Sequence, residues 1–388
     1  MADAVIVDVL RTPSGKGKPG GALSGIHPVQ LLADTFSGLL ERNQLDPELI
    51  DDVLAGCVSQ AGEQTANIAR NAALVAGLPE SVPATTIDRQ CGSSQQAVHF
   101  AAQGVIAGAY DVVLAGGVES MSRVPMFSAT MGKDPYEPLA TRYPDGLVPQ
   151  GVSAELIAAR WKLDRQTLDE FAAESHRRAA AAGASGAFDR EILPIGDVHT
   201  DETVRPSTTV AGLAGLKPSF ADPGLQTRFG EINWSITPGN SSPLTDGASA
   251  ALIMNASKAT ELGLTPRARF HAGTVTGSDP LLMLTGVLPA TGKLLERSGL
   301  GIDDLDAYEV NEAFAPVPLI WQREFNADPE RLNPRGGAIA LGHPLGASGT
   351  RLLTTLINQL EATGGRYGLQ TMCEGGGMAN AMIIERLG

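Results

Sequence analysis

The sequence predicts an α/β fold with a largely parallel sheet, two related halves and a long inserted segment. From the amino terminus, short strand-like apolar stretches alternate with stretches whose apolar residues recur at helical spacing. Between about residues 120 and 243 this alternation stops, and proline, glycine and short polar clusters dominate. After that segment the alternation resumes in the earlier order, which indicates an internal duplication.

Charge and hydropathy limit the kinds of partner and the kinds of fold that the sequence predicts. The chain has 388 residues, 43% of them hydrophobic, and a net charge of −14, so it is long enough to bury a large core. The negative balance argues against nucleic acid or an anionic membrane surface as a partner. No apolar run reaches the ~18 residues that a membrane helix needs. An anionic substrate would therefore have to be captured by a local basic patch.

The cysteine pattern bears on compartment and metal content. The three cysteines, at positions 57, 91 and 373, lack CxxC spacing, so neither a disulfide framework nor a zinc ribbon is predicted, and we expect no metal site. The amino terminus runs directly into a predicted strand, Ala4–Val9, which leaves no room for a signal peptide. We therefore expect a reducing, cytoplasmic location.

The first half, residues 1–119, alternates regularly between strands and helices. The loop Gly15–Gly21 after the first strand lacks the GxxxxGK order, so it does not predict a phosphate-binding loop. Cys57 falls inside a strand and is most simply a core residue. The predicted strands are Ala4–Val9, Asp52–Val58, Thr85–Ile87 and Asp111–Leu114 (closed by Ala115-Gly116-Gly117), and the predicted helices are Val29–Leu40, Asn67–Val75 and one from Ser94.

Cys91 stands at the turn between a strand that we predict to be buried, Thr85–Ile87, and the helix from Ser94. This helix is apolar nearly all round, with Phe100 on one apolar face, and should be buried. Unpaired N–H groups and the positive end of the helix dipole meet at such a turn and favour thiolate over thiol. The alternative is that Cys91 is one more small buried hydrophobic residue.

The segment 120–243 is too long for a loop and too irregular to continue the sheet, so we interpret it as an inserted, lid-like domain. It contains two predicted helices, Ser153–Arg160 and Asp164–Ala182, the second with Asp164 as its cap. A strand over Asp246–Asn255 then completes the first half within residues 244–266.

The second half, residues 267–388, repeats the order of the first. His343 lies in a glycine-rich turn before a helix, as Cys91 does, and Cys373 stands between a strand and three glycines. If a two-fold relates the halves, the Cys91 and His343 turns should face one another. The predicted strands are Ala268–Val275, Leu305–Val310 and Leu369–Met372, and Gly337–Leu341 leads into the His343 turn.

These residue types can support covalent catalysis. An imidazole beside a thiol can take its proton, and lowering a thiol pKa from ~8.5 to ~6.5 is worth roughly 2.7 kcal/mol. Backbone N–H groups near the glycines after Cys373 could form an oxyanion hole. Asn311, after a strand, could hold a water or a carbonyl group. Taken singly, each also fits a structural role: a satisfied histidine, a buried thiol, a turn asparagine.

Four motifs give the chain a full-length resemblance to the thiolases (acetyl-CoA C-acyltransferases). Residues 333–349 match the family's histidine motif throughout, and Asn311-Glu312-Ala313-Phe314 matches its NEAF motif. Residues 373–377 match the second-cysteine motif, and Cys91-Gly92-Ser93 matches the nucleophile motif. The resemblance implies two similar α/β halves in a five-layered α-β-α-β-α core with an inserted CoA-binding loop domain, and a homodimer or homotetramer.

The resemblance also implies roles for individual residues. Cys91 would be the acyl-carrying nucleophile and His343 its activator, while Cys373 would be the acid/base for the acetyl-CoA carbanion. His343 and a water on Asn311 would stabilise the enolate oxygen, and the N–H groups of Cys91 and Gly375 the oxyanion. Coenzyme A, a substrate and not a tightly bound cofactor, would contact Arg205 near its adenine and Ser242 on its pantetheine arm.

Several positions depart from the family pattern. Asp88 and Ser94 replace the common Asn and Gly, and Glu374 stands beside Cys373 where an apolar residue is usual. An inward-facing carboxylate there would raise the pKa of the thiol, so we expect Glu374 to point away. Pro149-Gln150 replaces the His-Met pair of acetoacetyl-specific members, which favours a degradative 3-ketoacyl-CoA thiolase, with a long or bulky acyl group.

Three alternatives compete with this function. The first is a biosynthetic acetoacetyl-CoA thiolase, and the second is a non-catalytic acyl-CoA or lipid carrier that kept the fold. The presence of all four predicted catalytic side chains argues against a carrier, because binding alone requires none of them. A ketoacyl synthase would use two histidines and one cysteine, and Cys373 stands where its second histidine belongs.

Overall fold

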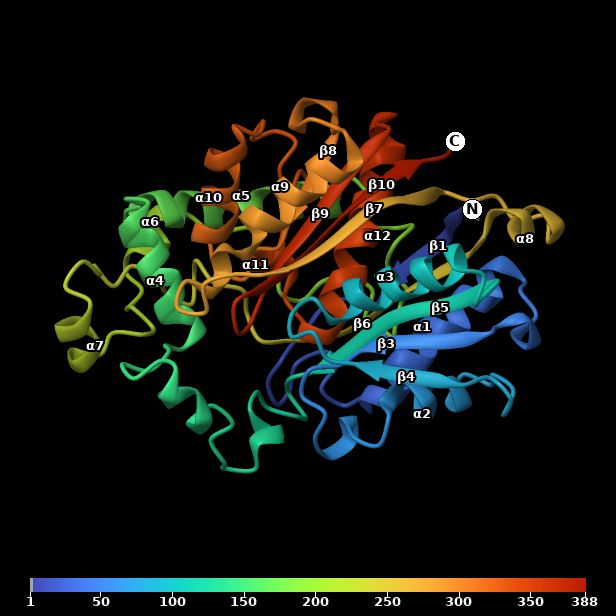
Figure 1. The fold of residues 1–388 in the computed structure, drawn as a ribbon, viewed down its shortest axis with the longest axis horizontal. Coiled ribbons are helices and arrows are strands. Elements are labelled where there is room, and N and C mark those ends of the chain that lie inside the picture. Colours follow the sequence, from blue (N-terminus) through green and yellow to red (C-terminus); the bar gives the residue numbers. More distant parts are fainter. Residues whose placement is uncertain (1–2) are drawn as a thin grey trace.

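A computed structural model of the chain describes residues 3–388 as a mixed ten-stranded sheet flanked by helices (Figure 1). The strands run in the order β4-β3-β5-β6-β1-β7-β10-β9-β8, with the short β2 paired to β6. The strands are β1 (Ala4–Arg11), β2 (Gly15–Lys16), β3 (Asp52–Gly56), β4 (Ala84–Ile87), β5 (Val112–Ser120), β6 (Thr245–Asn255), β7 (Ala268–Gly277), β8 (Ala307–Val310), β9 (Tyr367–Glu374) and β10 (Met378–Arg386).

Helices pack on both faces of this sheet. The helices are α1 (Pro28–Asn43), α2 (Ile68–Val75), α3 (Ser93–Ile106), α4 (Gln150–Arg160), α5 (Arg165–Ala184), α6 (Val210–Ala214), α7 (Pro223–Arg228), α8 (Ala256–Glu261), α9 (Val287–Ser298), α10 (Pro316–Phe325), α11 (Ala338–Leu341) and α12 (Ser348–Thr363). Within residues 3–388 none of them combines the length and the apolar character that crossing a membrane requires.

The topology confirms the internal duplication. In the first half the strands lie in the order β3-β5-β6-β1, and in the second half in the order β8-β9-β10-β7, so equivalent strands occupy equivalent places. The pairing directions also agree, because β3–β5 and β8–β9 are parallel and the remaining pairs within each set are antiparallel. β4 adds to β3 in parallel, and an isolated parallel bridge from Tyr308 to Leu332 takes the equivalent place in the second half.

The prediction of a largely parallel sheet was wrong. Only the β3–β4, β3–β5 and β8–β9 ladders are parallel among the described strands. The last strand of each half returns antiparallel to its neighbours: β10 turns back from β9 through a tight hairpin, and β6 returns after the inserted segment. Gly376 and Gly377 allow the hairpin because both adopt the left-handed region, with φ of 81° and 80°.

The predicted five layers are confirmed. One apolar core lies under α1 and α2 on the outer face of the first half, and another lies under α9 and α10 on the outer face of the second. A third core contains side chains of α3, α12 and both half-sheets, so α3 and α12 form the central layer (Figure 1). The half-sheets are joined where Val5 and Ile6 of β1 pair with Arg269 and Ala268 of β7.

The elements around Cys91 differ from prediction in two respects. β4 is not buried, because it is an edge strand whose only neighbour is β3, and Thr85 is exposed. α3 is buried along most of its length as expected, but Phe100 is 42% exposed because it lies on the side turned away from both half-sheets.

β5 continues through the glycines that we expected to close it. Gly116 and Gly117 lie inside the strand, where side chains would overlap the backbone oxygens of Ser249 and Gly346. The glycines therefore permit close approach of β6 and of the His343 turn, and do not end the strand.

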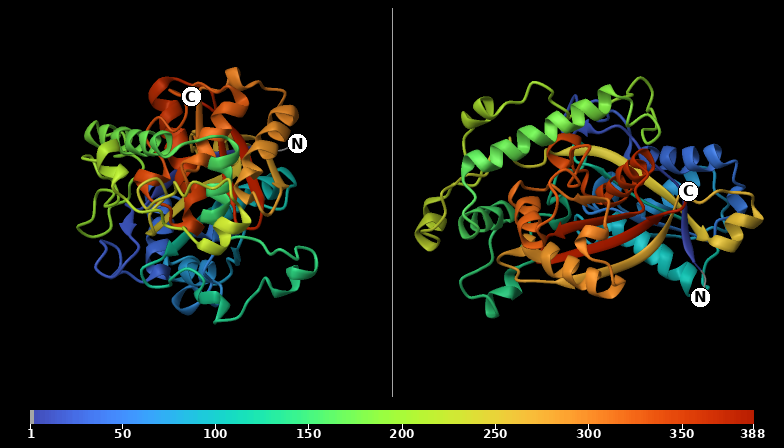
Figure 2. Two further views of the ribbon diagram at one scale, coloured as in Figure 1. Left: turned by 90° about the vertical axis from the view of Figure 1, so that its left-hand side faces the viewer. Right: turned by 90° about the horizontal axis from the view of Figure 1, so that it is seen from above.

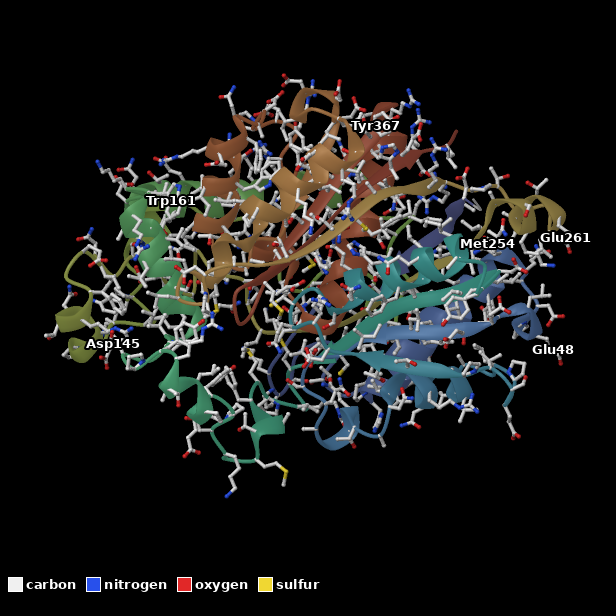
Figure 3. The ribbon with its side chains drawn as sticks, in the orientation of Figure 1. Glu48, Asp145, Trp161, Met254, Glu261 and Tyr367 are labelled. Atoms are coloured by element: carbon white, nitrogen blue, oxygen red, sulfur yellow. The ribbon has the colours of Figure 1, made fainter. Side chains whose placement is uncertain are left out.

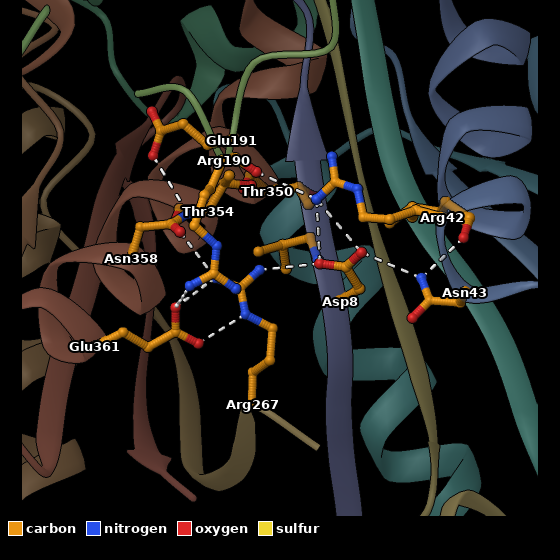
Figure 4. Close-up of polar contacts among 12 residues, drawn as sticks. Asp8, Arg42, Asn43, Arg190, Glu191, Arg267, Thr350, Thr354, Asn358 and Glu361 are labelled. Atoms are coloured by element: carbon orange, nitrogen blue, oxygen red, sulfur yellow. Dashed lines mark hydrogen bonds and ion pairs between the residues drawn. The ribbon is translucent and has the colours of Figure 1, made fainter. Parts of the chain in front are cut away.

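A polar network around Asp8 of β1 joins the two halves (Figure 4). Arg267, just before β7, donates to Asp8 of β1 at 2.9 Å and to Glu361 of α12 at 2.8 Å. Asn43 at the end of α1 donates to Asp8 at 3.1 Å. A hollow of about 630 Å³ lies beside this network, and none of the predicted catalytic residues lines it.

The segment between β5 and β6 packs on the second half. Apolar side chains of α4, α5 and α6 share one core with α9 and α10, and α5 lies across the molecule as the long helix of Figure 2. Asp164 caps α5 as predicted, accepting from the Thr167 N–H at 2.8 Å. Trp161, after α4, and Asp145 lie at the opposite end of the molecule from Glu48 and Glu261 (Figure 3).

Candidate active site

Cys91 lies in a tight turn at the foot of α3. Gln90 adopts a left-handed φ of 48°, and the Ser93 hydroxyl donates to the Gln90 carbonyl at 2.5 Å while accepting from the Arg89 N–H at 2.9 Å. Gly92 is the N-cap residue of α3. The turn holds Cys91 with only 5% of its surface exposed, against Leu352 of α12 and Met372 of β9.

The His343 turn occupies the equivalent position before α12. The His343 N–H donates to Thr245 Oγ1 at 3.0 Å, and Nδ1 lies 2.5 Å from Ser348 Oγ. Ser348 Oγ donates its own proton to the Pro344 carbonyl at 2.8 Å, so it must accept from Nδ1–H. This hydrogen bonding assigns the imidazole proton to Nδ1 and leaves the lone pair on Nε2.

Asn311 meets this free imidazole nitrogen. Asn311 follows β8, and its Nδ2 lies 3.3 Å from Nε2 of His343, in the arrangement of an amide donor and an imidazole acceptor. Its Oδ1 is buried and has no partner among the described residues. An amide oxygen in that state can accept a hydrogen bond from a water or a substrate group.

The two turns meet, as the two-fold relation of the halves predicts. Ser94 in the first turn of α3 accepts from the Thr350 N–H in the first turn of α12 at 3.0 Å. A side chain on Gly349 would overlap Gln95. The departure of Ser94 from the family's glycine thus has a structural role, because its hydroxyl satisfies a buried N–H group of α12.

Cys373 and Gly375 reach the same site from the β9–β10 hairpin. Burial, followed by the charge of Cys91, raises the pKa of Cys373 in β9. Its two neighbours along the strand, Met372 and Glu374, both lie against the Cys91 turn. A side chain on Gly375 would contact Gln90 Oε1 at 3.0 Å, so the hairpin glycine lies against the Cys91 turn. The structure therefore brings Cys91, His343, Asn311, Cys373 and Gly375 together.

The electrostatics contradict the expectation that the helix terminus makes Cys91 a thiolate. Burial, followed by the charge of Glu374, raises the pKa of Cys91 to about 12, although a hydrogen bond from Gln150 lowers it. Burial and the nearby Arg351 lower the pKa of His343 to about 3. Loss of hydration outweighs the dipole here, so the resting pair is a neutral thiol and a neutral imidazole.

Glu374 also differs from expectation. Its side chain does not point away from the site, because it lies directly beneath Gly92, where a methyl group would overlap Oε1. Successive side chains of β9 project to opposite faces, so Cys373 and Glu374 reach the Cys91 turn from different sides. A charge on Glu374 raises the pKa of both cysteines.

The two predicted CoA contacts are placed differently. The Ser242 N–H donates to the Ala313 carbonyl at 3.0 Å, which puts Ser242 beside the segment that begins with Asn311. Arg205 lies against His176 of α5, with Nη2 3.0 Å from Nε2. Across residues 3–388 no hydrogen bond joins Arg205 to the Cys91 or His343 turns.

Three supporting residues were not identified from the sequence. Ser348 fixes the imidazole, and its position five residues after the histidine in a glycine-rich turn was an available signal. The buried carboxylate of Glu119 accepts from the Gly346 and Val58 N–H groups, both at 2.9 Å, but nothing in its local sequence indicates this. Glu312 accepts from Asn333 Nδ2 at 2.8 Å, which joins the NEAF and histidine motifs.

Among residues 3–388, no group of three or more His, Cys, Asp or Glu side chains is arranged so that it could hold a metal ion. The chemical groups of the site are instead two thiols, an imidazole, an amide and backbone N–H groups. Such a set can support nucleophilic acyl transfer.

Comparison with known proteins places this site in context. Residues 4–257 match the family "Thiolase, N-terminal domain", and residues 264–386 match "Thiolase, C-terminal domain". A steroid 3-ketoacyl-CoA thiolase of Mycobacterium tuberculosis is 47% identical over 100% of this chain and 95% of its own length. A 3-ketoacyl-CoA thiolase of Aliivibrio salmonicida is 45% identical over the full length of both chains. The crystal structure of an acetyl-CoA acetyltransferase from Bacillus anthracis superposes with a TM-score of 0.89 at 35% identity, covering 100% of this chain and 99% of that one.

Proposed function

We propose catalytic roles for the clustered side chains from the premise that this chain belongs to the thiolase family. It is a 3-ketoacyl-CoA thiolase, an acyltransferase that cleaves 3-ketoacyl-CoA with CoA to give acetyl-CoA and a shortened acyl-CoA. The observation that supports the proposed roles is the contact between the first turns of α3 and α12, which follow Cys91 and His343, together with the hydrogen bond between Asn311 and His343.

In the first half-reaction, Nε2 of His343 takes the proton of Cys91, and the sulfur attacks the 3-keto carbon of the substrate. The N–H groups of Cys91 and Gly375 receive the oxyanion of the tetrahedral intermediate. The bond between C2 and C3 then breaks, leaving an acyl group on Cys91. The electron pair of that bond passes to the acetyl-CoA enolate, which Cys373 protonates at carbon.

The neutral resting state suits this sequence. Because Nε2 carries no proton, His343 can accept the proton of Cys91 and, once protonated, donate a hydrogen bond to the enolate oxygen together with a water on Asn311 Oδ1. His343 keeps that proton until the second half-reaction. The raised pKa of Cys373 keeps this thiol protonated until the carbanion forms, and the thiolate that remains after proton transfer is a strong base.

In the second half-reaction, the thiolate of Cys373 takes the proton of incoming CoA, and the CoA sulfur attacks the acyl group on Cys91. The thioester carbon–sulfur bond to Cys91 breaks, and His343 returns the proton to the leaving sulfur. Both thiols and the imidazole thereby regain their starting protonation, so the two half-reactions form a closed ping-pong cycle.

We infer that CoA approaches from the segment 120–243, treated as a loop domain between an N-terminal half (1–119 with 244–266) and a C-terminal half (267–388). The position of Ser242 beside Ala313 supports a contact with the pantetheine arm. Arg205 would have to leave His176 to contact the adenine. CoA acts as a dissociable substrate, and the enzyme is proposed to work as a cytoplasmic homodimer or homotetramer without a tightly bound cofactor.

We propose that the enzyme is a degradative thiolase whose 3-ketoacyl-CoA substrates carry a long or bulky acyl group. The name of the Mycobacterium tuberculosis relative, a steroid thiolase, supports this substrate range, as does Pro149-Gln150 in place of the His-Met pair of acetoacetyl-specific members. The 35% identical acetyl-CoA acetyltransferase structure keeps a biosynthetic acetoacetyl-CoA thiolase as the second candidate. Thiolysis rates across acetoacetyl, long-chain and ring-bearing 3-ketoacyl-CoA substrates distinguish them, because a biosynthetic enzyme would prefer acetoacetyl-CoA.

The nucleophile is tested by intact-mass analysis after mixing with 3-ketoacyl-CoA in the absence of CoA. Wild type should gain one acyl group on Cys91, and Cys91→Ser should gain none while still binding CoA. Cys57→Ser, a matched change in a buried strand-end thiol, should acylate normally. A normal burst of acylation in Cys91→Ser would overturn the assignment, and the absence of acylation in wild type would favour a carrier.

A further inference from the structure

Glu374 is a buried carboxyl group at the centre of the site that the catalytic cycle above does not use. It is the last residue of β9, directly after Cys373, and its exposed surface is 0%. Its Oε1 lies so close beneath the Cys91 turn that a side chain at position 92 would overlap it. Asn380 of β10 holds the same turn by donating to the Gly92 carbonyl at 2.9 Å.

The carboxyl group has no compensating partner. Neither oxygen of Glu374 is hydrogen-bonded within the described chain, and the buried Nε of Arg89 in the same turn is also unpaired. A buried carboxylate without hydrogen bonds or a paired cation is unfavourable, so the proton is retained instead. Burial raises the pKa of Glu374 to about 8, with Asp88 adding to the rise and Arg89 opposing it.

Both catalytic sulfurs respond to the charge of this group. The titratable groups that face Glu374 are Asp88, Arg89 and Cys91 on the loop between β4 and α3, and Cys373 on its own strand. From β10, the neutral amide of Asn380 lies at the same turn. A negative Glu374 would oppose the formation of thiolate at Cys91, whereas the protonated form leaves that step unhindered.

We propose that Glu374 is a positioning residue for thiolysis, whose carboxyl group must keep its proton for Cys91 to become a nucleophile. Loss of that proton stops acylation at alkaline pH, just where higher pH would otherwise help a thiol to ionise. The proposal rests on the proposed function, in which Cys91 carries the acyl group. It concerns the acidity of the nucleophile and predicts no direct contact between Glu374 and substrate.

The test is the pH dependence of kcat/KM for thiolysis in wild type and in Glu374→Gln, which keeps the shape and removes the titration. The wild-type rate should fall with a midpoint near pH 8. One pH unit above that midpoint about a tenth of the carboxyl groups remain protonated, so the variant should exceed wild type by about tenfold there. At neutral pH the two should agree within about threefold.

Glu309→Gln is the matched control, since burial also raises the pKa of Glu309 to about 8, but this residue lies on β8 beside Arg351. It should retain the alkaline fall. An unchanged fall in Glu374→Gln, or a folded Glu374→Gln that is inactive at every pH, would overturn the proposal. If Glu374→Gln does not fold, Glu374→Leu provides the same comparison.

Acylation of wild-type Cys91 at neutral pH separates this inference from the function on which it rests. If wild type is not acylated, the proposed nucleophile is wrong. If wild type is acylated but removal of the Glu374 charge leaves the pH profile unchanged, only the role of Glu374 fails.

Discussion

The Cys91 and His343 turns occupy equivalent places in the two halves, yet they are built in opposite ways. Around His343, Thr245 fixes the backbone and Ser348 fixes the imidazole. Beneath Cys91, both oxygens of Glu374 and the Nε of Arg89 are without partners among the described residues. A base must present one particular nitrogen, and in the His343 turn hydrogen bonds fix both the backbone and the ring. The pKa of a thiol nucleophile depends on its burial and on nearby charge, and in the Cys91 turn both are set by groups without hydrogen-bond partners, such as Glu374.

Removal of the His343 imidazole should have the largest effect on the rate of thiolysis. His343→Ala should lower kcat by a factor of about 10³ or more, because a thiol with a pKa raised to about 12 needs a base to become a nucleophile at neutral pH. Iodoacetamide alkylation of Cys91 at neutral pH should slow in parallel. Cys57, outside the site, serves as the internal control, and equal slowing at Cys57 would point to a general structural change.

The unpaired carboxyl group of Glu374, beneath the Cys91 turn, predicts that the stability of the fold depends on pH. The pKa of Glu374 is raised in the folded state, so its ionisation opposes folding, and stability is lost as pH rises from the ordinary glutamate range through about 8. Glu374→Gln should therefore gain stability over wild type with rising pH, reaching roughly 2–3 kcal/mol at pH 7. Urea unfolding at pH 5 and pH 7 measures this difference, and a constant difference would contradict the ionisation.

The hydrogen bond between Ser348 and the His343 ring predicts a smaller loss of rate. Ser348→Ala removes the acceptor that holds the proton on Nδ1, so a fraction of His343 should adopt the wrong tautomer, with a fall in kcat of roughly tenfold. KM should change little because the Ser348 side chain is fully buried. An increase in KM with unchanged kcat would show that Ser348 supports binding instead.

The smallest expected effect lies at the contact between the turns. Ser94→Ala leaves the buried Thr350 N–H without its 3.0 Å acceptor, which should destabilise the fold by about 1 kcal/mol. Thermal unfolding measures the change, and activity at neutral pH should persist. Ser257→Ala, at the exposed start of α8, is a matched serine change with no expected loss.

Much of this contrast could be predicted from the sequence, because the motifs are local. The glycine-rich stretch around His343, the NEAF segment and the Cys91 turn each carry their signal within a few residues. Order along the chain then predicted the duplication, and hence the meeting of the two turns. The helix cap at Asp164 was also predicted, since capping depends on adjacent residues alone.

The failures share a different cause, which is dependence on neighbours distant in the sequence. The direction of β6 and β10 follows from pairing across the sheet, so local strand character could not exclude a parallel arrangement. The helix-terminus argument for a Cys91 thiolate omitted the burial that α12 and β9 impose. The orientation of Glu374 depends on the space that Gly92 leaves in another element.

The seam at which β1 pairs with β7 has a consequence for how such a site can arise. Two separate copies of one half, associating through the same edge, would carry the same turn twice and would offer either two thiols or two imidazoles. Covalent fusion into one polypeptide releases the copies from that identity. Each turn can then specialise, and an asymmetric pair of reactive groups appears on a scaffold that is itself nearly symmetric.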